Sequence, residues 1–295
     1  MTTPEFTSNR DNFCYRHPDR QSFVLCQRCM RTICPECQTQ GPVGVICPEC
    51  LKAQRKAETS GQRRARRSWG GGPVAIARSG RPVVTLGIIL ITSIISLLQM
   101  VPTIGPAIEG SLLFAPLYVY AGVPGLPFEP WRLLTTALVH GGFIHLALNM
   151  LALWMLGQSL EPIIGRGRYL AMYAISALGG SVAVALIADP RTATVGASGA
   201  VFGLMAALLI IGRHIGANVT GILVVLGINF VLSFTLRGIA WEAHLGGAVV
   251  GAIVAFVYTR TRKREQRSLQ TVLLIAVSVV LIVVALFVPP LIHLS

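Results

Sequence analysis

The chain has 295 residues, of which 53% are hydrophobic and only 13% are charged, and its mean hydropathy is +0.64. This balance is too apolar for a soluble domain and predicts a protein that crosses the membrane several times. The formal net charge of +13 is unevenly spread, because residues 1–81 carry 14 of the 25 Lys and Arg residues and all seven cysteines. The basic character therefore requires no nucleic acid partner, and we expect none.

The N-terminal part is expected to stay in the cytosol. The first long apolar stretch begins only near Pro82, well beyond the place of a cleavable leader. Disulfides are rare in a reducing compartment, so the seven cysteines are candidates for metal binding.

Segment 1–52 contains four pairs of metal-binding residues, each with two residues between its members. Zinc prefers four nitrogen or sulfur ligands in a tetrahedron, and this spacing lets both members of a pair reach one ion. The pattern predicts two structural zinc ions, and its spacers are compatible with a cross-braced arrangement in which the first and third pairs share one ion and the second and fourth share the other. The segment resembles a B-box-type zinc finger, and its few apolar residues indicate that metal binding supplies much of its folding free energy. The pairs are Cys14 with His17, Cys26 with Cys29, Cys34 with Cys37, and Cys47 with Cys50.

Residues 53–81 form a predicted flexible linker rich in Arg, Ala, Ser and Gly. A nucleic-acid-binding tail is one interpretation of its arginines. A segment attracted to anionic lipid of the bilayer is favoured, because the arginines directly precede an apolar stretch. For the zinc-binding segment, a cytosolic protein partner and a simple tether both remain open.

Seven apolar segments follow the linker, and each is near the roughly 20 residues that a helix needs to cross the hydrocarbon core. We therefore predict an all-α polytopic membrane protein with a six-helix core at 82–260 and, at 261–295, a basic cytosolic loop and a seventh transmembrane helix. The predicted spans are 82–101, 142–160, 169–188, 196–212, 218–236, 240–259 and 270–291.

The basic residues predict the direction of these spans, because Lys and Arg gather in cytoplasmic loops. The most basic loops fall on the same side as the linker, which predicts a cytosolic N-terminus and an extracytoplasmic C-terminus. The expected location is a bacterial plasma membrane. The first outer loop, 102–141, is long and is expected to lie in the membrane interface. The inner loops carry Arg166, Arg168, Arg213, Arg260, Arg262, Lys263, Arg264 and Arg267, and the outer loops carry Arg132, Arg191 and Arg237.

Four polar residues lie at a similar depth in three predicted spans: Ser198, His244, His145 and Asn149. The second, fourth and sixth spans run from outside to inside, so their early residues share the outer half of the bilayer. Polar residues inside a span are costly and usually face the bundle interior. We therefore expect the four side chains to converge.

Together these residue types are suited to cleaving a peptide bond. A serine hydroxyl is a poor nucleophile until a neighbouring base takes its proton, and the imidazole of His244 suits that task. The backbone N–H groups at Ser198, in a first helical turn, have no intrahelical partner and can stabilise an oxyanion, with help from Asn149 and His145. No metal is needed for this chemistry.

Several neighbours are expected to support the four residues. Gly247 and Gly251 follow His244 at helical spacing, and a stripe of small residues would let the fourth span approach through Gly199. His140 is interpreted as a hydrogen-bonding structural residue or a water positioner. Phe202, one turn after Ser198, either packs against the His244 imidazole or fills the core.

The same residues suggest a known family. The chain resembles the rhomboid intramembrane serine proteases over about 82–260, and a seventh helix after six is found in part of that family. Phe202 departs from the family pattern, in which many relatives have a tyrosine there. The matching residues are Trp131 and Arg132 in the first loop, His140, His145 and Asn149 on the second span, Gly196, Ser198 and Gly199 on the fourth, and His244, Gly247 and Gly251 on the sixth.

The resemblance implies a Ser198–His244 dyad without a third acid, an oxyanion site that includes Asn149 and His145, and transmembrane proteins as substrates. It also implies lateral entry of a substrate helix between the second and fifth spans. Such a helix must unwind, so substrates should carry weak helix formers such as Gly or Pro near the cut.

Three other functions compete with this interpretation. An inactive rhomboid-like protein would bind transmembrane clients without cleaving them, but such proteins typically lose the serine or the histidine. A histidine-based transporter would need intramembrane carboxylates, and the acidic residues lie at the ends of the spans. An α/β-hydrolase is excluded because Ala200 stands where its motif requires glycine.

Overall fold

The structure, a computed structural model, describes residues 9–40, 44–57, 82–120, 125, 127–235 and 238–293. Contacts divide the chain into two units, Met1–Arg64 and Ala65–Ser295. Most of the predicted linker, from residue 58 to 81, lies outside the described residues, as does Arg237. The domain boundaries given above stay predictions.

The first unit is small and contains little regular structure. Two strands, β1 (Thr39–Gln40) and β2 (Val45–Ile46), pair antiparallel, and helix α2 (Pro48–Ala57) follows them. Three-residue 3-10 turns at Arg10–Asn12 and Pro35–Cys37 complete the described part of this unit. Its buried apolar cluster consists of five cysteines and Ile33, whereas Phe23 is 69% exposed. The unit therefore has almost no core apart from its thiols.

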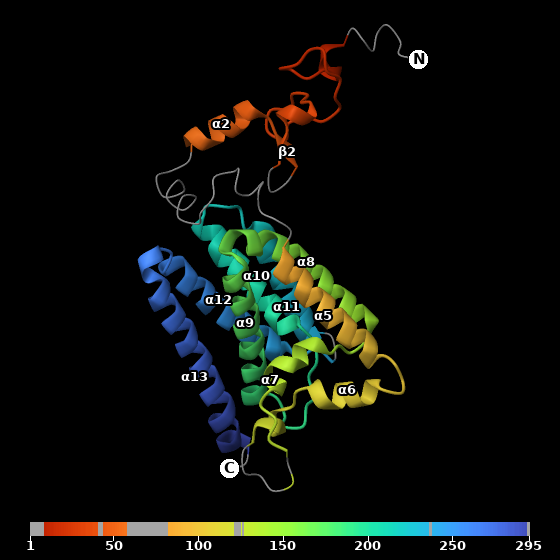
Figure 1. The fold of residues 1–295 in the computed structure, drawn as a ribbon, viewed down its shortest axis with the longest axis vertical. Coiled ribbons are helices and arrows are strands. Elements are labelled where there is room, and N and C mark those ends of the chain that lie inside the picture. The colour runs from red at the N-terminus through yellow and green to blue at the C-terminus, as the bar shows by residue number, and fades with distance from the viewer. Residues whose placement is uncertain are drawn as a thin grey trace. The chain divides into compact units, whose positions relative to one another are not determined.

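The second unit is a bundle of helices (Figure 1). Each of the seven predicted apolar segments overlaps one apolar helix of the structure, with ends that differ by a few residues. Two further short helices, α6 (Gly105–Leu112) and α7 (Arg132–Thr135), lie in the connection after the first of them, with 3-10 turns at Pro116–Val119 and Thr136–Leu138. A last 3-10 turn, Arg264–Gln266, precedes the final helix. The apolar helices are α5 (Val83–Gln99), α8 (Phe143–Ile164), α9 (Arg166–Ile187), α10 (Ser198–His214), α11 (Thr220–Thr235), α12 (Trp241–Arg260) and α13 (Arg267–His293).

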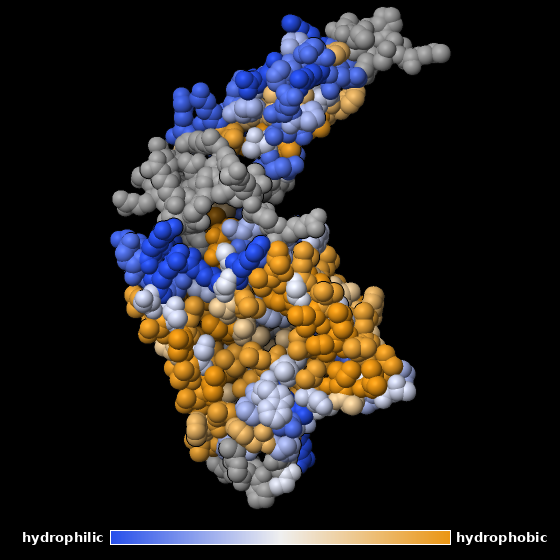
Figure 2. Space-filling model, in the orientation of Figure 1, coloured by the Kyte–Doolittle hydropathy of each residue, from blue (hydrophilic) through white to orange (hydrophobic). Residues whose placement is uncertain are grey.

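Among the described residues, four helices are long and apolar enough to cross a membrane: α8, α9, α12 and the segment that contains α13. The other three, α5, α10 and α11, have 17, 17 and 16 residues. The molecule is thus a mostly helical integral membrane protein, and a total of seven spans stays a prediction. Its visible face carries a broad apolar surface over α5, α8 and α13 (Figure 2). The exposed large apolar side chains of these helices include Leu90, Ile144, Leu148, Ile275 and Val283.

Helices α9, α10 and α12 form the centre of the bundle, and α10 has its most extensive contacts with α12. Small residues make this packing possible. A Cβ atom at Gly247 of α12 would lie 2.0 Å from the carbonyl oxygen of Gly199 on α10, so only glycine fits there. Around this centre, α5 lies along α8 and α13 lies along α9 (Figure 1).

The connections before α8 and α10 are fixed by hydrogen bonds. Phe114 and Thr194 form an isolated antiparallel bridge between the connection that follows α6 and the segment that leads into α10. Arg132 is buried, pairs with the carboxylate of Glu129, donates to the carbonyl of Leu113 and lies over the ring of Tyr118. These contacts hold the first long loop against the bundle.

Candidate active site

Ser198 is the first residue of α10, and the chain enters this helix through a glycine turn. Gly196 has φ of +121°, a conformation that residues with a side chain rarely adopt. Its N–H donates to the carbonyl of Thr136 at 3.0 Å, and the N–H of Ala197 donates to His140 Nε2 at 3.3 Å. The turn thus fixes the N-terminus of α10, where backbone N–H groups have no intrahelical acceptor.

His140 is a structural anchor for this turn. Its ring is buried, and Nδ1 lies 2.9 Å from Ser96 Oγ, which itself donates to the carbonyl of Leu138. The backbone N–H and C=O of His140 both bond to the side-chain amide of Gln99. Of the two roles considered from the sequence, these contacts fit the hydrogen-bonding one, and they tie α5 to the turn before Ser198.

His244 lies near the start of α12 and is buried. Its imidazole stacks on the ring of Phe202, with the ring centroids 4.0 Å apart and the planes 11° from parallel. Phe202 lies one helical turn after Ser198 on α10, so the two side chains share a face of that helix. The stack therefore brings the imidazole to the face of α10 that carries the hydroxyl.

The close approach of the two helices extends over more than one turn. Gly199 and Gly247 meet as described above, and a Cβ at Gly251 would lie 2.4 Å from the Cα of Gly203. Among the hydrogen bonds of the described residues, none joins Ser198 Oγ to His244. The structure brings the two helices together at the required positions, and the dyad stays a prediction.

The two residues expected to help at the oxyanion lie on α8, and one of them packs against the same turn. The ring of His145 approaches Gly196 so closely that an added Cβ would be 2.7 Å from Cε1, and its Nδ1 accepts from the N–H of Gly141. Asn149, one turn further along α8, is buried and donates one amide hydrogen to the carbonyl of His145. The second amide hydrogen of Asn149 is not used by that bond.

Trp131 and Arg132 lie apart from these side chains. Trp131 is 53% exposed, and the described contacts of Arg132 are all with residues of the first loop. These contacts fit a role in anchoring the first loop, and not a role in the chemistry of the site.

The sequence reading missed two serines that contact the histidines. Ser233 Oγ on α11 lies 2.6 Å from His244 Nδ1, and Ser96 bonds His140 as described above. Each is one hydroxyl within a long apolar segment, so no motif or spacing singled it out.

The eight candidate metal ligands of the first unit gather into two groups, and their pairing is the cross-braced one. In each group, one ligand atom from every member lies within 4.8 Å of all the others. Two sulfurs on one tetrahedral zinc lie about 3.8 Å apart and a sulfur and a nitrogen about 3.6 Å. The observed separations are 3.8 Å between Cys29 and Cys47, and 3.3 and 3.4 Å from His17 Nδ1 to Cys34 and Cys37. The groups are Cys14, His17, Cys34 and Cys37, and Cys26, Cys29, Cys47 and Cys50.

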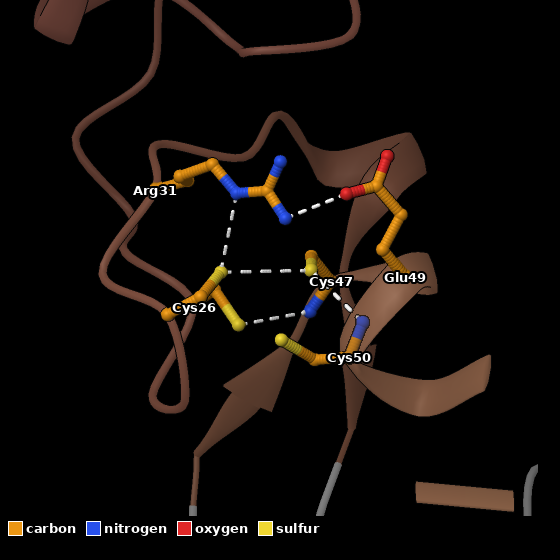
Figure 3. Close-up of polar contacts among 6 residues, drawn as sticks. Cys26, Arg31, Cys47, Glu49 and Cys50 are labelled. Atoms are coloured by element: carbon orange, nitrogen blue, oxygen red, sulfur yellow. Dashed lines mark hydrogen bonds and ion pairs between the residues drawn. The ribbon is translucent and has the colours of Figure 1, made fainter. Parts of the chain in front are cut away.

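The second group also has outer contacts (Figure 3). Arg31 donates to Cys29 Sγ at 3.4 Å and pairs with Glu49 at 2.6 Å, while the backbone N–H groups of Cys47 and Cys50 donate to sulfur. Such donors stabilise thiolates and orient ligands around a cation.

The thiols differ in how readily they ionise. Burial and the neighbouring thiols raise the pKa of Cys37 to about 11 and that of Cys50 to about 12. At Cys14 and Cys26 burial acts in the same direction, but backbone N–H donors outweigh it and lower the pKa to about 6. A cation bound in either group would favour the ionised thiolates, since metal ligands must be deprotonated. Both groups could hold a metal ion.

Known proteins are similar to the part of the chain that contains these residues. The family model described as the rhomboid domain matches residues 127–261. The rhomboid protease GluP of Bacillus subtilis (strain 168) is 38% identical over 161 residues, which are 51% of this chain and 31% of GluP. The RHOMBOID-like protein 5 of Arabidopsis thaliana is 39% identical over 139 residues, 44% of each chain.

A second Bacillus subtilis (strain 168) relative, YdcA, is 31% identical over 142 residues, which are 46% of this chain and 71% of YdcA. The chain thus covers most of YdcA but less than half of the length of GluP and of RHOMBOID-like protein 5. The matched family segment contains α8 to α12 and with them every residue of the candidate active site except Ser96 and Gln99.

Proposed function

The chain belongs to the rhomboid family, and from this we propose that it is an intramembrane serine endopeptidase that cleaves other membrane proteins in or near their transmembrane segments. The observation that supports this most directly is the stack of the His244 imidazole on Phe202, one turn from Ser198. A base held on that face of α10 is what a serine nucleophile requires.

The proposed reaction has two halves. His244 Nε2 takes the hydroxyl proton of Ser198 while Oγ bonds to the scissile carbonyl carbon. The tetrahedral intermediate collapses, the C–N bond breaks, and His244 returns the proton to the leaving amine, which leaves an ester on Ser198. A water molecule then gives a proton to His244 and attacks the ester carbonyl. The ester C–O bond breaks, the new carboxyl end is released, and His244 returns the proton to Ser198 Oγ.

Negative charge that develops on the carbonyl oxygen needs donors that are already in place. The first-turn N–H groups of α10 follow the turn at Gly196, and the His145 ring packs against that turn. Asn149 lies one turn further along α8 and has one spare amide hydrogen. We assign the oxyanion site to these groups. The fixed turn at Gly196 and Ala197 keeps the donors oriented without reorganisation.

The substrate is proposed to enter laterally between α8 and α11 and to unwind before it reaches Ser198. A helical carbonyl is hydrogen-bonded and shielded, so a bound segment must be extended to react. The protein is proposed to lie in a bacterial plasma membrane. The basic loops support an orientation with the N-terminus in the cytosol and the C-terminus outside.

Two structural zinc ions are proposed for the first unit. The ligand separations fit tetrahedral sites, and a unit with almost no apolar core gains folding free energy from metal binding. No step of the proposed proteolysis involves these ions.

Cleavage of a model transmembrane substrate by the purified protein in lipid tests the function. We expect the wild-type protein to cleave, Ser198→Ala to be inactive, and Ser159→Ala, which removes an exposed hydroxyl on α8, to cleave like wild type. Persistent cleavage by Ser198→Ala would end the proposal. Binding of the substrate without cleavage by wild-type protein would instead favour an inactive client-binding rhomboid.

A further inference from the structure

We propose that Ser233 of α11 is a positioning residue that holds His244 in the one tautomer able to accept a proton from Ser198. The inference rests on the proposed function and extends it by a third residue, which acts through the histidine and does not touch the substrate. It links the base to α11, a helix that contributes no other residue to the candidate site.

The contact between the two side chains is short and buried. Ser233 Oγ lies 2.6 Å from His244 Nδ1, and the residues are 3% and 7% exposed. Ser233 Oγ also lies 2.7 Å from the carbonyl oxygen of Asn229, one turn earlier on α11. Buried polar atoms this close to a partner form hydrogen bonds, because an unpaired buried polar group costs free energy.

The number of hydrogens available decides which atom donates. A carbonyl oxygen only accepts, so the single hydroxyl hydrogen of Ser233 serves Asn229. The hydroxyl oxygen is then an acceptor toward His244, and Nδ1 must carry the hydrogen. The tautomer that keeps both contacts has a hydrogen on Nδ1 and a free lone pair on Nε2, and a general base acting on Ser198 needs that lone pair.

A second histidine of the same protein has the same arrangement, and there the outcome is fixed independently. Ser96 Oγ donates to a backbone carbonyl and contacts His140 Nδ1, while His140 Nε2 accepts the N–H of Ala197. An Nε2 that accepts a backbone N–H carries no hydrogen, so His140 is protonated on Nδ1. The serine therefore acts as an acceptor there, as we infer for Ser233.

The arrangement also serves the charged state of the base. When His244 takes the proton of Ser198 it becomes a cation inside an apolar bundle, and Ser233 remains an acceptor for its Nδ1–H. A hydrogen bond to a charged group is stronger than one to a neutral group, so the contact gains strength as the reaction proceeds. This is the direction in which a contact must change to accelerate the reaction.

Ser233 is the one buried residue among the described side chains of α11, whose Leu223, Val231 and Phe234 are exposed. Phe230, also on α11, has its ring centroid 6.5 Å from that of Phe202. Among the described residues, the only side-chain hydrogen bond between α11 and another helix is the one that joins Ser233 and His244. Movement of α11 away from α12 breaks this bond and releases the tautomer.

Three variants of the full-length protein in lipid test the proposal by cleavage kinetics. We expect Ser233→Ala to lower kcat about 10- to 100-fold with little change in KM, because a buried bond to a charged group is lost. Ser233→Thr keeps the hydroxyl and is expected to restore most of the rate. The matched control is Thr235→Val, which removes an exposed hydroxyl from the same helix and should cleave like wild type.

Nitrogen-15 NMR of protein labelled at histidine gives a readout that a purely structural role would not move. We expect the His244 ring to show a protonated Nδ1 and an unprotonated Nε2 in wild type and Ser233→Thr, and a mixture of tautomers in Ser233→Ala. The proposal is overturned when Ser233→Ala keeps the wild-type rate, or when wild-type His244 carries its hydrogen on Nε2. Absence of cleavage by every variant, wild type included, would count against the proteolytic function, and the NMR signal would still decide the tautomer.

Discussion

At the scale of single residues, the groups around the His244 imidazole set its orientation. One face of the His244 imidazole stacks on Phe202 and Nδ1 meets Ser233, so both the plane and the rotation of the ring are fixed. Phe202 is itself buried between α10 and its neighbours. Phe202 has no hydroxyl, so it orients the imidazole by the stacking of its ring alone.

Replacing Phe202 tests this account of the ring. Phe202→Leu keeps an apolar side chain but loses the stack, which is worth about 0.5 to 1.5 kcal/mol for an aromatic pair. We expect kcat for a model substrate to fall about 3- to 10-fold, since the imidazole samples more orientations. Phe202→Tyr retains the ring and should stay close to wild type. Equal rates for Phe202→Leu and wild type would show that the stack plays no part.

At the scale of elements, glycine contacts set the distance between the helices that carry the serine and the histidine. No side chain fits at Gly247 because the carbonyl of Gly199 occupies that space, and Gly246 meets the carbonyl of Gly179 on α9 in the same way. Close backbone approach of this kind provides much of the packing between helices in a membrane, where lipid is as apolar as the side chains. The site geometry is therefore a consequence of helix packing.

Gly247→Ala should separate α10 from α12 and damage both stability and activity. We expect a loss of about 1 to 3 kcal/mol in stability, the usual range for overpacking, and a large fall in cleavage rate. Gly227→Ala on α11 is the matched control, because nothing lies within 4 Å of an added Cβ there. Thermal unfolding in detergent and cleavage rates measure the two effects. A neutral Gly247→Ala would contradict the packing argument.

The sequence predicted much of this architecture, and for physical reasons. Long apolar stretches located the helices because a spanning helix needs length and hydropathy, and the spacing within cysteine pairs located the metal groups. The helical spacing of Gly247 and Gly251 indicated which face of α12 packs closely against α10. The pairing of Ser233 with His244 was not predictable, because it depends on the rotation of α11 and one hydroxyl carries no periodic signal.

At the scale of the whole molecule, the two units differ in what holds them together. The helical unit has an extensive apolar core, whereas the buried apolar cluster of the first unit is mostly cysteine. We expect folding of the first unit to depend on bound metal, since burial of so few side chains cannot offset the loss of chain entropy. Metal removal should therefore unfold the first unit and leave the helical unit intact.

Native mass spectrometry and limited proteolysis test this dependence. We expect two zinc ions per wild-type chain, one after Cys34→Ala, and rapid cleavage within residues 9–57 once a strong chelator is added. The mutated group loses one of its four ligands while the other group stays complete. An unchanged proteolysis pattern in the chelator would refute the role of metal in folding.

A chain that begins at Ser79 separates the functions of the two units. Since every residue of the candidate active site lies beyond that point, we expect the shortened chain to cleave a model substrate in lipid. Comparison with the full-length protein then shows how far the first unit alters the rate. Complete loss of cleavage in a folded shortened chain would contradict the independence of the helical unit.

The proposed proteolysis depends above all on Ser198 acting as a nucleophile that is activated by His244. The most direct measurement is labelling of the membrane-embedded protein with a fluorophosphonate, followed by mass spectrometry of its peptides. We predict a single covalent adduct on Ser198 that is strongly reduced in His244→Ala and unchanged in Thr235→Val. An adduct on another residue, or undiminished labelling of Ser198 without the histidine, would contradict the account.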